Sequence, residues 1–210
     1  MKKLLAILLS CTAMAAAMTG CSDDDNSDSS VESEDSQVTT DADEADLGEY
    51  TYSELGTKLY YDSEDIPDEL MAALEKYFIS FSQHDYDSYA ECLYSEYITE
   101  MNEFLEADYG YDLETSFENQ CSSLETNAGG EFTVTRIKAE LPEEDGSEDY
   151  LTSLGEIFET DFYETVKNGC DAIHDVTFYV MAEADGEETL LISEFEIVFA
   201  EKDGAFYTFG

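Results

Sequence analysis

The stretch AIHDVTFYVMAEADGEETLLISEFEIVFAEKDGAFYTF, residues 172–209, decides the fold. In its first third, every second side chain is apolar except for one histidine; these residues are Ala172, His174, Val176, Phe178, Val180 and Ala182. A period of two indicates a β-strand. Asp185-Gly186 and Asp203-Gly204 separate three such runs, and Asp-Gly favours the tight turn between antiparallel strands. The stretch therefore predicts an antiparallel meander.

Upstream of the meander, the apolar residues recur at helical spacing. We expect four helices between residues 66 and 126, each placed by its start and stop signals. The first spans residues 66–83, with Asp65 as N-cap and Pro67 in the first turn. A short second helix begins at Asp85 or Asp87, and a third is capped by Ser95 and ends at Gly110. The fourth runs from about 112 to 126 and ends before Gly129-Gly130.

Between these helices and the meander, the pattern predicts one more strand and one more helix. Phe132 and Val134 alternate in one phase, and Ile137 and Ala139 in the other, which indicates a strand with a bulge near Arg136. An acidic loop follows, and helical spacing returns at about 149–166. Residues 50–210 are thus expected to form a single α+β domain, with helices packed on a curved antiparallel sheet.

The N-terminal segment has the pattern of a secretory signal. Lys2 and Lys3 precede an apolar run that ends in Met18-Thr19-Gly20-Cys21. This ending resembles the lipobox of bacterial lipoproteins, in which small residues precede the cysteine. The resemblance implies a signal peptide at 1–20 and a lipidated Cys21 as the new N-terminus. A membrane anchor at Cys21 would place the protein on the extracytoplasmic face of the cell membrane.

Residues 21–49 are expected to form a disordered linker. From Ser22 through Glu49 the chain holds twelve acidic residues and no base or aromatic residue. Such a segment buries too little apolar surface to offset the entropy lost on ordering. Charge repulsion should keep it extended, so that it holds the folded domain away from the membrane.

The charge of the whole chain excludes one class of partner. The 210 residues carry 52 acidic and 8 basic side chains, a formal net charge of −44. Nucleic-acid binding needs clustered Lys and Arg, so a nucleic-acid partner is excluded. The same charge favours a basic or cationic partner at the cell envelope through long-range attraction.

The order of helices and strands, ending in Glu201-Lys202-Asp203-Gly204-Ala205-Phe206-Tyr207, resembles the cone-shaped nuclear-transport-factor-2-like and cystatin-like folds. Some enzymes of this fold use a His–carboxylate pair in a central pocket. The resemblance makes His84 and His174 weak candidates for a general base. Adjacent strand residues point to opposite faces, so Asp175 is poorly placed to orient His174. The alternative, without a catalytic role, is that the His174 imidazole lies in the core or lines a pocket.

No sequence motif indicates a cofactor, and two histidines without paired cysteines indicate no transition-metal site. Cys92 and Cys121 are the pair to test first for a disulfide, although buried free thiols are equally compatible with the sequence. Fifteen Tyr and twelve Phe indicate either an aromatic core or an exposed binding patch. The densest cluster is Tyr86, Tyr89, Tyr94 and Tyr97.

Two functions remain open. The first is a lipid-anchored, non-enzymatic binding or scaffold module at the bacterial cell envelope. The alternative is a small-molecule enzyme, an isomerase, lyase or hydrolase, with its pocket inside the cone. An enclosed pocket with a histidine and a carboxylate within hydrogen-bond reach would favour the enzyme, whereas a filled cone with exposed tyrosines would favour the binding module. A purely structural module, the third possibility, predicts neither feature.

Overall fold

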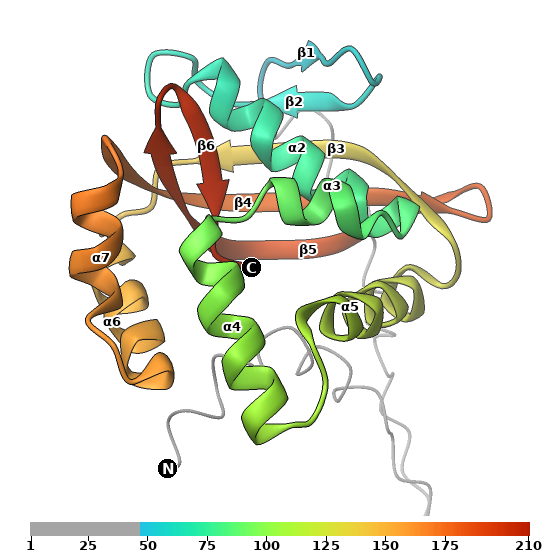
Figure 1. Ribbon diagram of the computed structural model, residues 1–210. Helices are drawn as coiled ribbons and strands as arrows, with labels where there is room; N and C mark the ends of the chain where they lie inside the picture. The colour runs from blue at the N-terminus through green and yellow to red at the C-terminus, as the bar shows by residue number, and fades with distance from the viewer. Residues whose placement is uncertain (1–46) are drawn as a thin grey trace, which may run out of the picture.

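The computed structural model describes residues 47–210, which form an α+β fold with helices over a six-stranded sheet (Figure 1). The signal segment, Cys21 and residues 22–46 of the linker lie outside the described residues. The strands are β1 (Thr51–Tyr52), β2 (Lys58–Tyr60), β3 (Phe132–Glu140), β4 (Ala172–Ala184), β5 (Glu187–Lys202) and β6 (Ala205–Thr208). The helices are α2 (Asp68–Gln83), α3 (Tyr86–Glu91), α4 (Ser95–Asp108), α5 (Leu113–Ala128), α6 (Ser147–Phe158) and α7 (Phe162–Gly169).

The sheet is mixed, with its strands in chain order from β1 to β6. All neighbouring strands are antiparallel except β2 and β3, which run parallel with Lys58 opposite Arg136. The expectation of a wholly antiparallel sheet is therefore wrong at this pair. Strands of two and three residues are too short to show a period of two, and for this reason the sequence pattern did not reveal β1 and β2.

The meander expected at residues 172–209 is confirmed. Asp185 and Gly186 have φ values of 52° and 83°, and Asp203 and Gly204 have 54° and 76°. Two successive positive φ values match the twist of the strands that such a turn joins. The bulge in β3 is confirmed as well, because the register with β4 shifts between Val134 and Arg136.

Side-chain capping fixes two helix starts as the sequence predicts. The Asp85 carboxylate accepts a hydrogen bond from the Ser88 backbone N–H at 3.0 Å, and Asp112 accepts one from Thr115 at 2.9 Å. The other two starts differ from the prediction. Helix α2 begins at Asp68 with Pro67, not Asp65, as N-cap, and Ser95 is the first residue of α4 rather than its cap.

The single helix predicted at 149–166 is wrong, because the chain forms α6 and α7 with a sharp turn between them. Glu159 ends α6 in the left-handed conformation, with φ of 56°, and the Thr160 N–H donates to the Gly155 carbonyl oxygen at 3.0 Å. Gly155 permits this turn, since a Cβ there would lie 2.7 Å from the Thr160 carbonyl oxygen. The apolar spacing continues across the turn and conceals it in the sequence.

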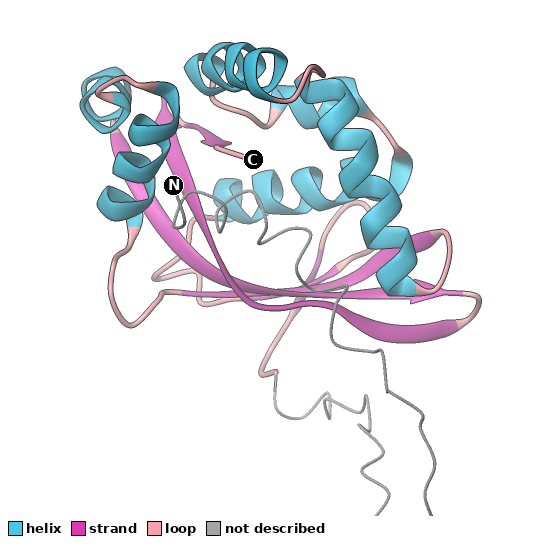
Figure 2. Ribbon diagram, turned by 90° about the horizontal axis from the view of Figure 1, so that it is seen from below, coloured by secondary structure: helices cyan, strands magenta, loops and turns pink. Residues whose placement is uncertain are grey.

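The helices gather on one side of the sheet, which curls toward them as a half-barrel (Figure 2). Phe78 of α2 meets Phe178 of β4 with ring centroids 4.9 Å apart, and Phe117 of α5 stacks on Phe81 at 5.1 Å. These rings form the centre of the core. Burial of large aromatic side chains dominates the hydrophobic stabilisation of such a layer.

The two ends of the curled sheet differ in how their edges are covered. Thr208 of β6 exchanges backbone hydrogen bonds with the segment Cys92–Tyr94, which covers the outer edge of β6. By contrast, β6 pairs with β5 only from Phe199 to Lys202. Within residues 47–210, the outer edge of β5 from Glu187 to Val198 therefore has no strand partner.

Candidate functional site

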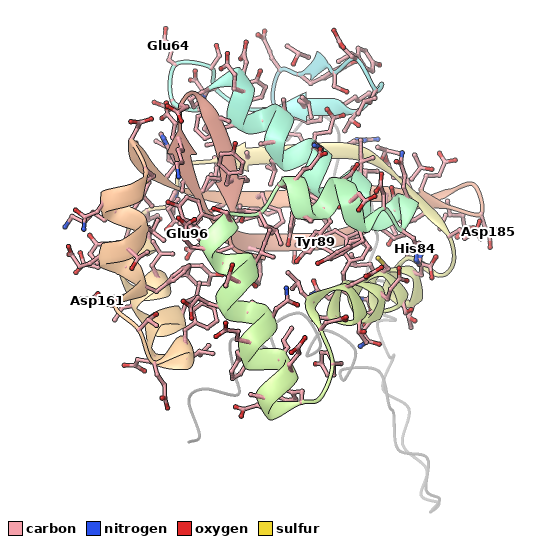
Figure 3. All side chains as sticks on the ribbon, viewed as in Figure 1. Glu64, His84, Tyr89, Glu96, Asp161 and Asp185 are labelled. Carbon is pink, nitrogen blue, oxygen red and sulfur yellow. The ribbon has the colours of Figure 1, made fainter. Side chains whose placement is uncertain are left out.

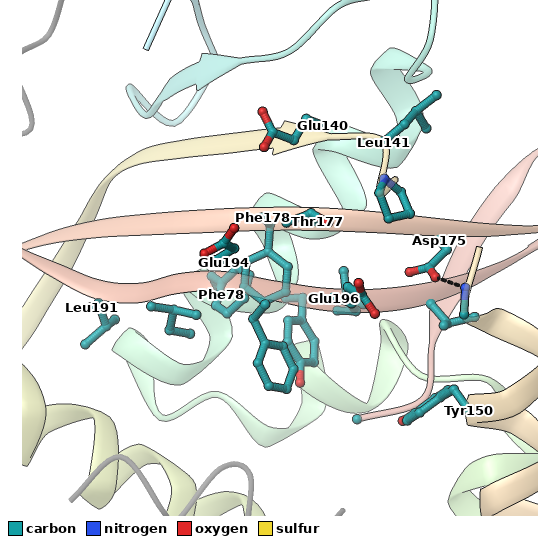
Figure 4. Close-up of a pocket in the computed structure, with 18 of the residues that line it drawn as sticks. Phe78, Glu140, Leu141, Tyr150, Asp175, Thr177, Phe178, Leu191, Glu194 and Glu196 are labelled. Atoms are coloured by element: carbon teal, nitrogen blue, oxygen red, sulfur yellow. Dashed lines mark hydrogen bonds between the residues drawn. The ribbon is translucent and has the colours of Figure 1, made fainter. Parts of the chain in front are cut away.

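A cavity of about 940 Å³ lies along the unpaired part of β5. It is lined by residues of α2, α5, β4 and β5, by the start of α6, and by the loop after β3 (Figure 4). Five consecutive residues of β5, from Glu194 to Val198, line it. Since successive strand residues point to opposite faces, the cavity reaches both faces of the sheet around the edge of β5. Its volume is in the range of small-molecule sites.

One part of the lining, the aromatic wall, consists of six rings that belong to α2, α6, β4 and β5. Phe78 and Phe178 are buried where they pack together, and Tyr150 of α6 donates a hydrogen bond to the Phe209 carbonyl oxygen at 3.2 Å. Tyr77, Phe78, Phe81 and Phe178 are buried in the core behind the cavity, and Tyr150 and Phe195 are partly exposed to it. The aromatic wall comprises Tyr77, Phe78, Phe81, Tyr150, Phe178 and Phe195.

The other part, the acidic wall, consists of six carboxylates, and no Lys, Arg or His is among the residues that line the cavity. Glu140 forms an ion pair with Lys138 at 2.7 Å. In the described part of the chain, no ion pair includes Asp175, Glu194 or Glu196. The cavity therefore carries an uncompensated negative charge. The acidic wall comprises Glu140, Glu143, Glu144, Asp175, Glu194 and Glu196.

Asp175 is the most unusual member of the acidic wall, because its side chain is only 7% exposed. The Gly146 backbone N–H donates to its Oδ2 at 2.7 Å, as Figure 4 shows. Its Oδ1 is buried and has no hydrogen-bond partner among the described residues. Burial raises the pKa of the Asp175 carboxyl above its ordinary value; the hydrogen bond from Gly146 opposes this rise, and the nearby Glu196 adds to it.

Gly146 brings the backbone close to two carboxylates. A Cβ on Gly146 would lie 3.3 Å from Asp175 Oδ2 and 3.5 Å from Glu196 Oε2. A side chain at this position would therefore crowd the Asp175 carboxylate, which the Gly146 N–H holds by its hydrogen bond.

The two histidines lie outside the cavity. His174 faces Glu201 of β5, with 2.9 Å between Nε2 and Oε2, and its ring packs edge-on against Phe206. Asp175 instead turns to Gly146, in agreement with the argument that neighbouring strand residues diverge. His174 thus has a carboxylate within hydrogen-bond reach, but this carboxylate is Glu201 and neither residue lines the cavity.

His84 joins two helices at the surface. It ends α2 in the left-handed conformation, and Figure 3 places it beside α5. Its Nε2 lies 3.0 Å from Glu125 Oε1 and its Nδ1 lies 3.3 Å from Glu118 Oε2, and both glutamates belong to α5. The hydrogen bonds to Glu125 and then to Glu118 raise the pKa of His84. This geometry suits an imidazolium that donates from both nitrogens and links α2 to α5.

The tyrosine cluster belongs mainly to the core. Tyr89, Tyr94 and Tyr97 are buried, and Tyr86 is half-buried against Phe117. Tyr89 packs on Phe117 with ring centroids 4.7 Å apart. None of the four lines the cavity. These residues therefore form no exposed aromatic patch, and the aromatic wall is made of other rings.

Cys92, Cys121 and Cys170 are free thiols in the structure. Burial raises the pKa of Cys92 to about 11 and that of Cys121 to about 12. Thiols with such values stay protonated near neutral pH and are poor nucleophiles. Cys21, the expected lipidation site, lies outside the described residues.

Residues 47–210 hold neither a metal-binding cluster nor a helix that could span a membrane. No three His, Cys, Asp or Glu side chains gather in that range so as to hold a metal ion. No helix there combines the length and the apolar character that crossing a bilayer needs.

Sequence patterns did not single out Asp175, Gly146 or Glu196 as a site. One signal was available: Asp175 is a charged residue next to the apolar alternation of Val176, Phe178, Val180 and Ala182. A charged residue in a strand that is buried elsewhere is unusual, because burial disfavours its charged form. Gly146 lies in an acidic loop far from Asp175 in sequence, and only the fold brings the two together. In comparisons with models of protein families, with curated proteins and with solved structures, the chain matches none.

Proposed function

We propose that this protein is a ligand-binding module of the bacterial cell envelope and that the cavity beside β5 is its binding site. One observation carries the proposal: a cavity of about 940 Å³ combines an aromatic wall with an uncompensated acidic wall. Binding sites typically combine a large apolar surface with a few polar groups that orient the ligand.

A binding role is favoured over an enzymatic one by the position of the titratable side chains. His84 and His174, the candidate general bases, lie outside the cavity lining, and the buried thiols have raised pKa values. A general base must lie within hydrogen-bond reach of the bound substrate. The cavity offers carboxylates for orientation and aromatic rings for contact, which is the chemistry of binding.

The proposed location depends on the N-terminal sequence. The resemblance of residues 18–21 to a lipobox supports lipidation at Cys21, and the acidic composition of residues 21–49 supports an extended, disordered tether. Labelling cells with an alkyne-bearing fatty acid should mark the wild-type protein but not a Cys21→Ser variant. Equal labelling of both forms, or an unmodified Cys21 by mass spectrometry, would contradict the anchor.

We also propose that the domain is a member of the cone-shaped group of nuclear-transport-factor-2-like and cystatin-like folds. The curled sheet with helices on its concave side supports this assignment. Two features depart from the arrangement that the sequence led us to expect: the parallel β2–β3 pair and the division of the helical segment between β3 and β4 into α6 and α7.

Fluorescence of the neutral dye Nile red tests whether the cavity binds ligands. The dye should gain fluorescence with the wild-type chain and lose most of that gain with Leu124→Trp, because Leu124 lines the cavity from α5. Leu55→Trp is the matched control, since Leu55 is 69% exposed in the turn between β1 and β2. The proposal fails if the dye does not bind, or if both variants behave alike.

A further inference from the structure

We infer that the ligand of the site is an extended segment of a basic partner protein, which adds to the outer edge of β5 as a further strand. Its side chains would be basic on one face and apolar on the other. This inference rests on the proposed function and specifies the chemical class of the ligand. Three features of the described residues support it: unpaired backbone groups on β5, a regular register beside them, and the different character of the two faces at this edge.

The backbone of β5 has unpaired hydrogen-bonding groups on its outer side. Thr208 of β6 forms backbone hydrogen bonds with the segment 92–94, away from β5, so the residue before Thr208 faces β5, where it pairs with Ala200. Successive strand residues direct their backbone groups to alternate sides, so Val198 and Glu196 direct theirs to the same outer side as Ala200. No backbone hydrogen bond joins Glu196 or Val198 to β6, or to a helix or loop of the described domain. Such groups at a sheet edge are available to another strand.

The register of β5 limits where a strand can be added. From Phe195 to Glu201, each residue of β5 has one partner on β4 without interruption. Before Phe195 the register shifts twice, and Glu194 has a φ of 51°, in the left-handed region. Bulges of this kind protect a sheet edge, because they break its straight row of backbone groups. The edge is therefore disrupted up to Glu194 and regular from Phe195 to Val198, which is the part that lines the cavity.

The face of the sheet opposite to Phe178 determines the charge of the added segment. On this face Glu196 lies beside Thr177 of β4, which lies beside Glu140 of β3, so the three side chains form one row across the sheet. The next position in the row belongs to the added strand, with the exposed Glu196 as its cross-strand neighbour. Opposite charges in such a pair are stabilising, and like charges are destabilising. Because no Lys, Arg or His lines the cavity, a basic side chain is favoured at this position and an acidic one is disfavoured.

The other face of the same edge is apolar. Phe195 lies opposite Phe178 on β4, with ring centroids 5.8 Å apart, and Ile197 shares their face. Alternate side chains of the added strand would extend this row and contact Phe195, which is partly exposed to the cavity. Since strand side chains alternate between faces, the expected ligand has basic and apolar residues in alternation.

A second copy of this chain is disfavoured as the added strand. Two β5 edges would bring acidic side chains together, and the net charge of −44 repels one copy from another. The linker of the same chain is disfavoured for the same reason, because residues 22–49 hold twelve acidic residues and no base. Charge complementarity therefore selects a basic segment of another protein.

Isothermal titration of the full chain at physiological ionic strength tests the inference with a blocked peptide of about six alternating lysine and valine residues. Two isomers of this peptide carry methyl groups on the backbone nitrogens of either the lysines or the valines. In an antiparallel addition that places lysine beside Glu196, the lysine N–H groups point at β5. Methylation of the lysines should therefore weaken binding by about tenfold or more, whereas methylation of the valines should not. A peptide with glutamate in place of lysine should not bind measurably.

Equal binding of the two methylated isomers would mean that charge attraction alone, without strand addition, holds the peptide, and would overturn the inference. Absence of binding by the unmethylated peptide would overturn it too. The Nile red measurement then decides separately whether the cavity binds ligands.

Two substitutions at one position separate the backbone from the charge. Glu196→Pro removes the outward N–H, which takes no part in pairing with β4, and should weaken peptide binding by about tenfold or more. Glu196→Gln keeps this N–H and removes the charge, and should weaken binding by at most about fivefold. Glu183→Gln is the matched control, since it removes one charge from an exposed site on β4 outside the cavity, and it should bind as the wild-type chain does.

Undiminished binding of the peptide by Glu196→Pro would overturn the inference. A dimer of the wild-type chain in sedimentation that Glu196→Pro dissociates would overturn it as well, because a second copy would then occupy the edge. The titration of the methylated isomers uses the wild-type chain, so it decides the question even if the proline variant does not fold.

Discussion

At the scale of single residues, Asp175 illustrates how a residue of the proposed binding site lowers stability. Its carboxylate is buried in a sheet, accepts one hydrogen bond at Oδ2, and lies near the negative charge of Glu196. A hydrophobic residue at this position would stabilise the fold more. Residues that lower stability are a common property of functional sites, where the requirements of the ligand compete with those of the fold.

The variant Asp175→Asn should therefore be more stable than the wild-type chain at neutral pH. The folded-state pKa of Asp175 is raised above its unfolded value, so the native state holds this proton more tightly. Asp175 thus loses stability as the pH rises from below its unfolded pKa through its folded pKa, and asparagine does not titrate. Melting curves should show an advantage for Asn at pH 7 that disappears near pH 3. A variant that melts below the wild-type protein at pH 7 would contradict this account.

His84 shows the opposite dependence on pH. Its folded pKa is raised by Glu125 and Glu118, so its contribution is fully present below the unfolded pKa, ~6.5, and is lost as the pH rises through the folded pKa. The side chain is 36% exposed, and solvent screening limits such a pair to about 0.2–1 kcal/mol. His84→Asn, which tolerates the left-handed conformation, should lower the melting temperature at pH 6 and have less effect at pH 9. An equal effect at both pH values would assign His84 a purely conformational role.

At the scale of secondary-structure elements, the sequence predicted most of the fold but not the site. Long elements with a clear period, such as β4, β5 and α5, and turns with a specific chemistry, such as Asp185-Gly186, were predictable because local physics determines them. The short strands β1 and β2 depend on pairing with β3, which no local pattern records. The cavity depends on a contact between Gly146 and Asp175, 29 positions apart, and on where β6 stops pairing with β5.

The turn between α6 and α7 offers a test of how one glycine shapes an element. Gly155→Ala would favour the helix by about 1 kcal/mol from propensity alone. The added Cβ, however, would lie 2.7 Å from the Thr160 carbonyl oxygen and 3.2 Å from the Phe162 backbone nitrogen, and backbone atoms cannot easily move away. Overpacking of this kind costs about 1–3 kcal/mol, so we expect a net loss of stability on urea denaturation. Glu156→Ala, at the next and exposed position, should change stability by less than about 0.5 kcal/mol. A stabilised Gly155→Ala would show that the turn relaxes.

At the scale of the whole molecule, net charge and core packing have opposite effects on the stability of the folded domain. The helices and the curled sheet share one aromatic core, which draws the chain together. The net charge of −44 acts against this compaction, and Lys76, Arg136, Lys138 and Lys167 form scattered ion pairs, of which Lys76–Glu91 is exposed. Such pairs contribute little individually. Self-repulsion is therefore the main electrostatic influence on the stability of the fold, while the same negative field attracts cationic ligands.

Salt should consequently stabilise this protein. Between 10 mM and 0.1 M NaCl the Debye length falls from about 30 Å to about 10 Å, which screens repulsion between charges on opposite sides of the domain. We expect the melting temperature to rise by roughly 5 °C or more over this range, measured by circular dichroism at pH 7. A variant that replaces five exposed glutamates by glutamine should melt higher at 10 mM NaCl and respond less to salt; suitable positions are Glu54, Glu64, Glu103, Glu114 and Glu187. A melting temperature that falls with salt would mean that ion pairs outweigh repulsion, and the charge would then support the fold rather than oppose it.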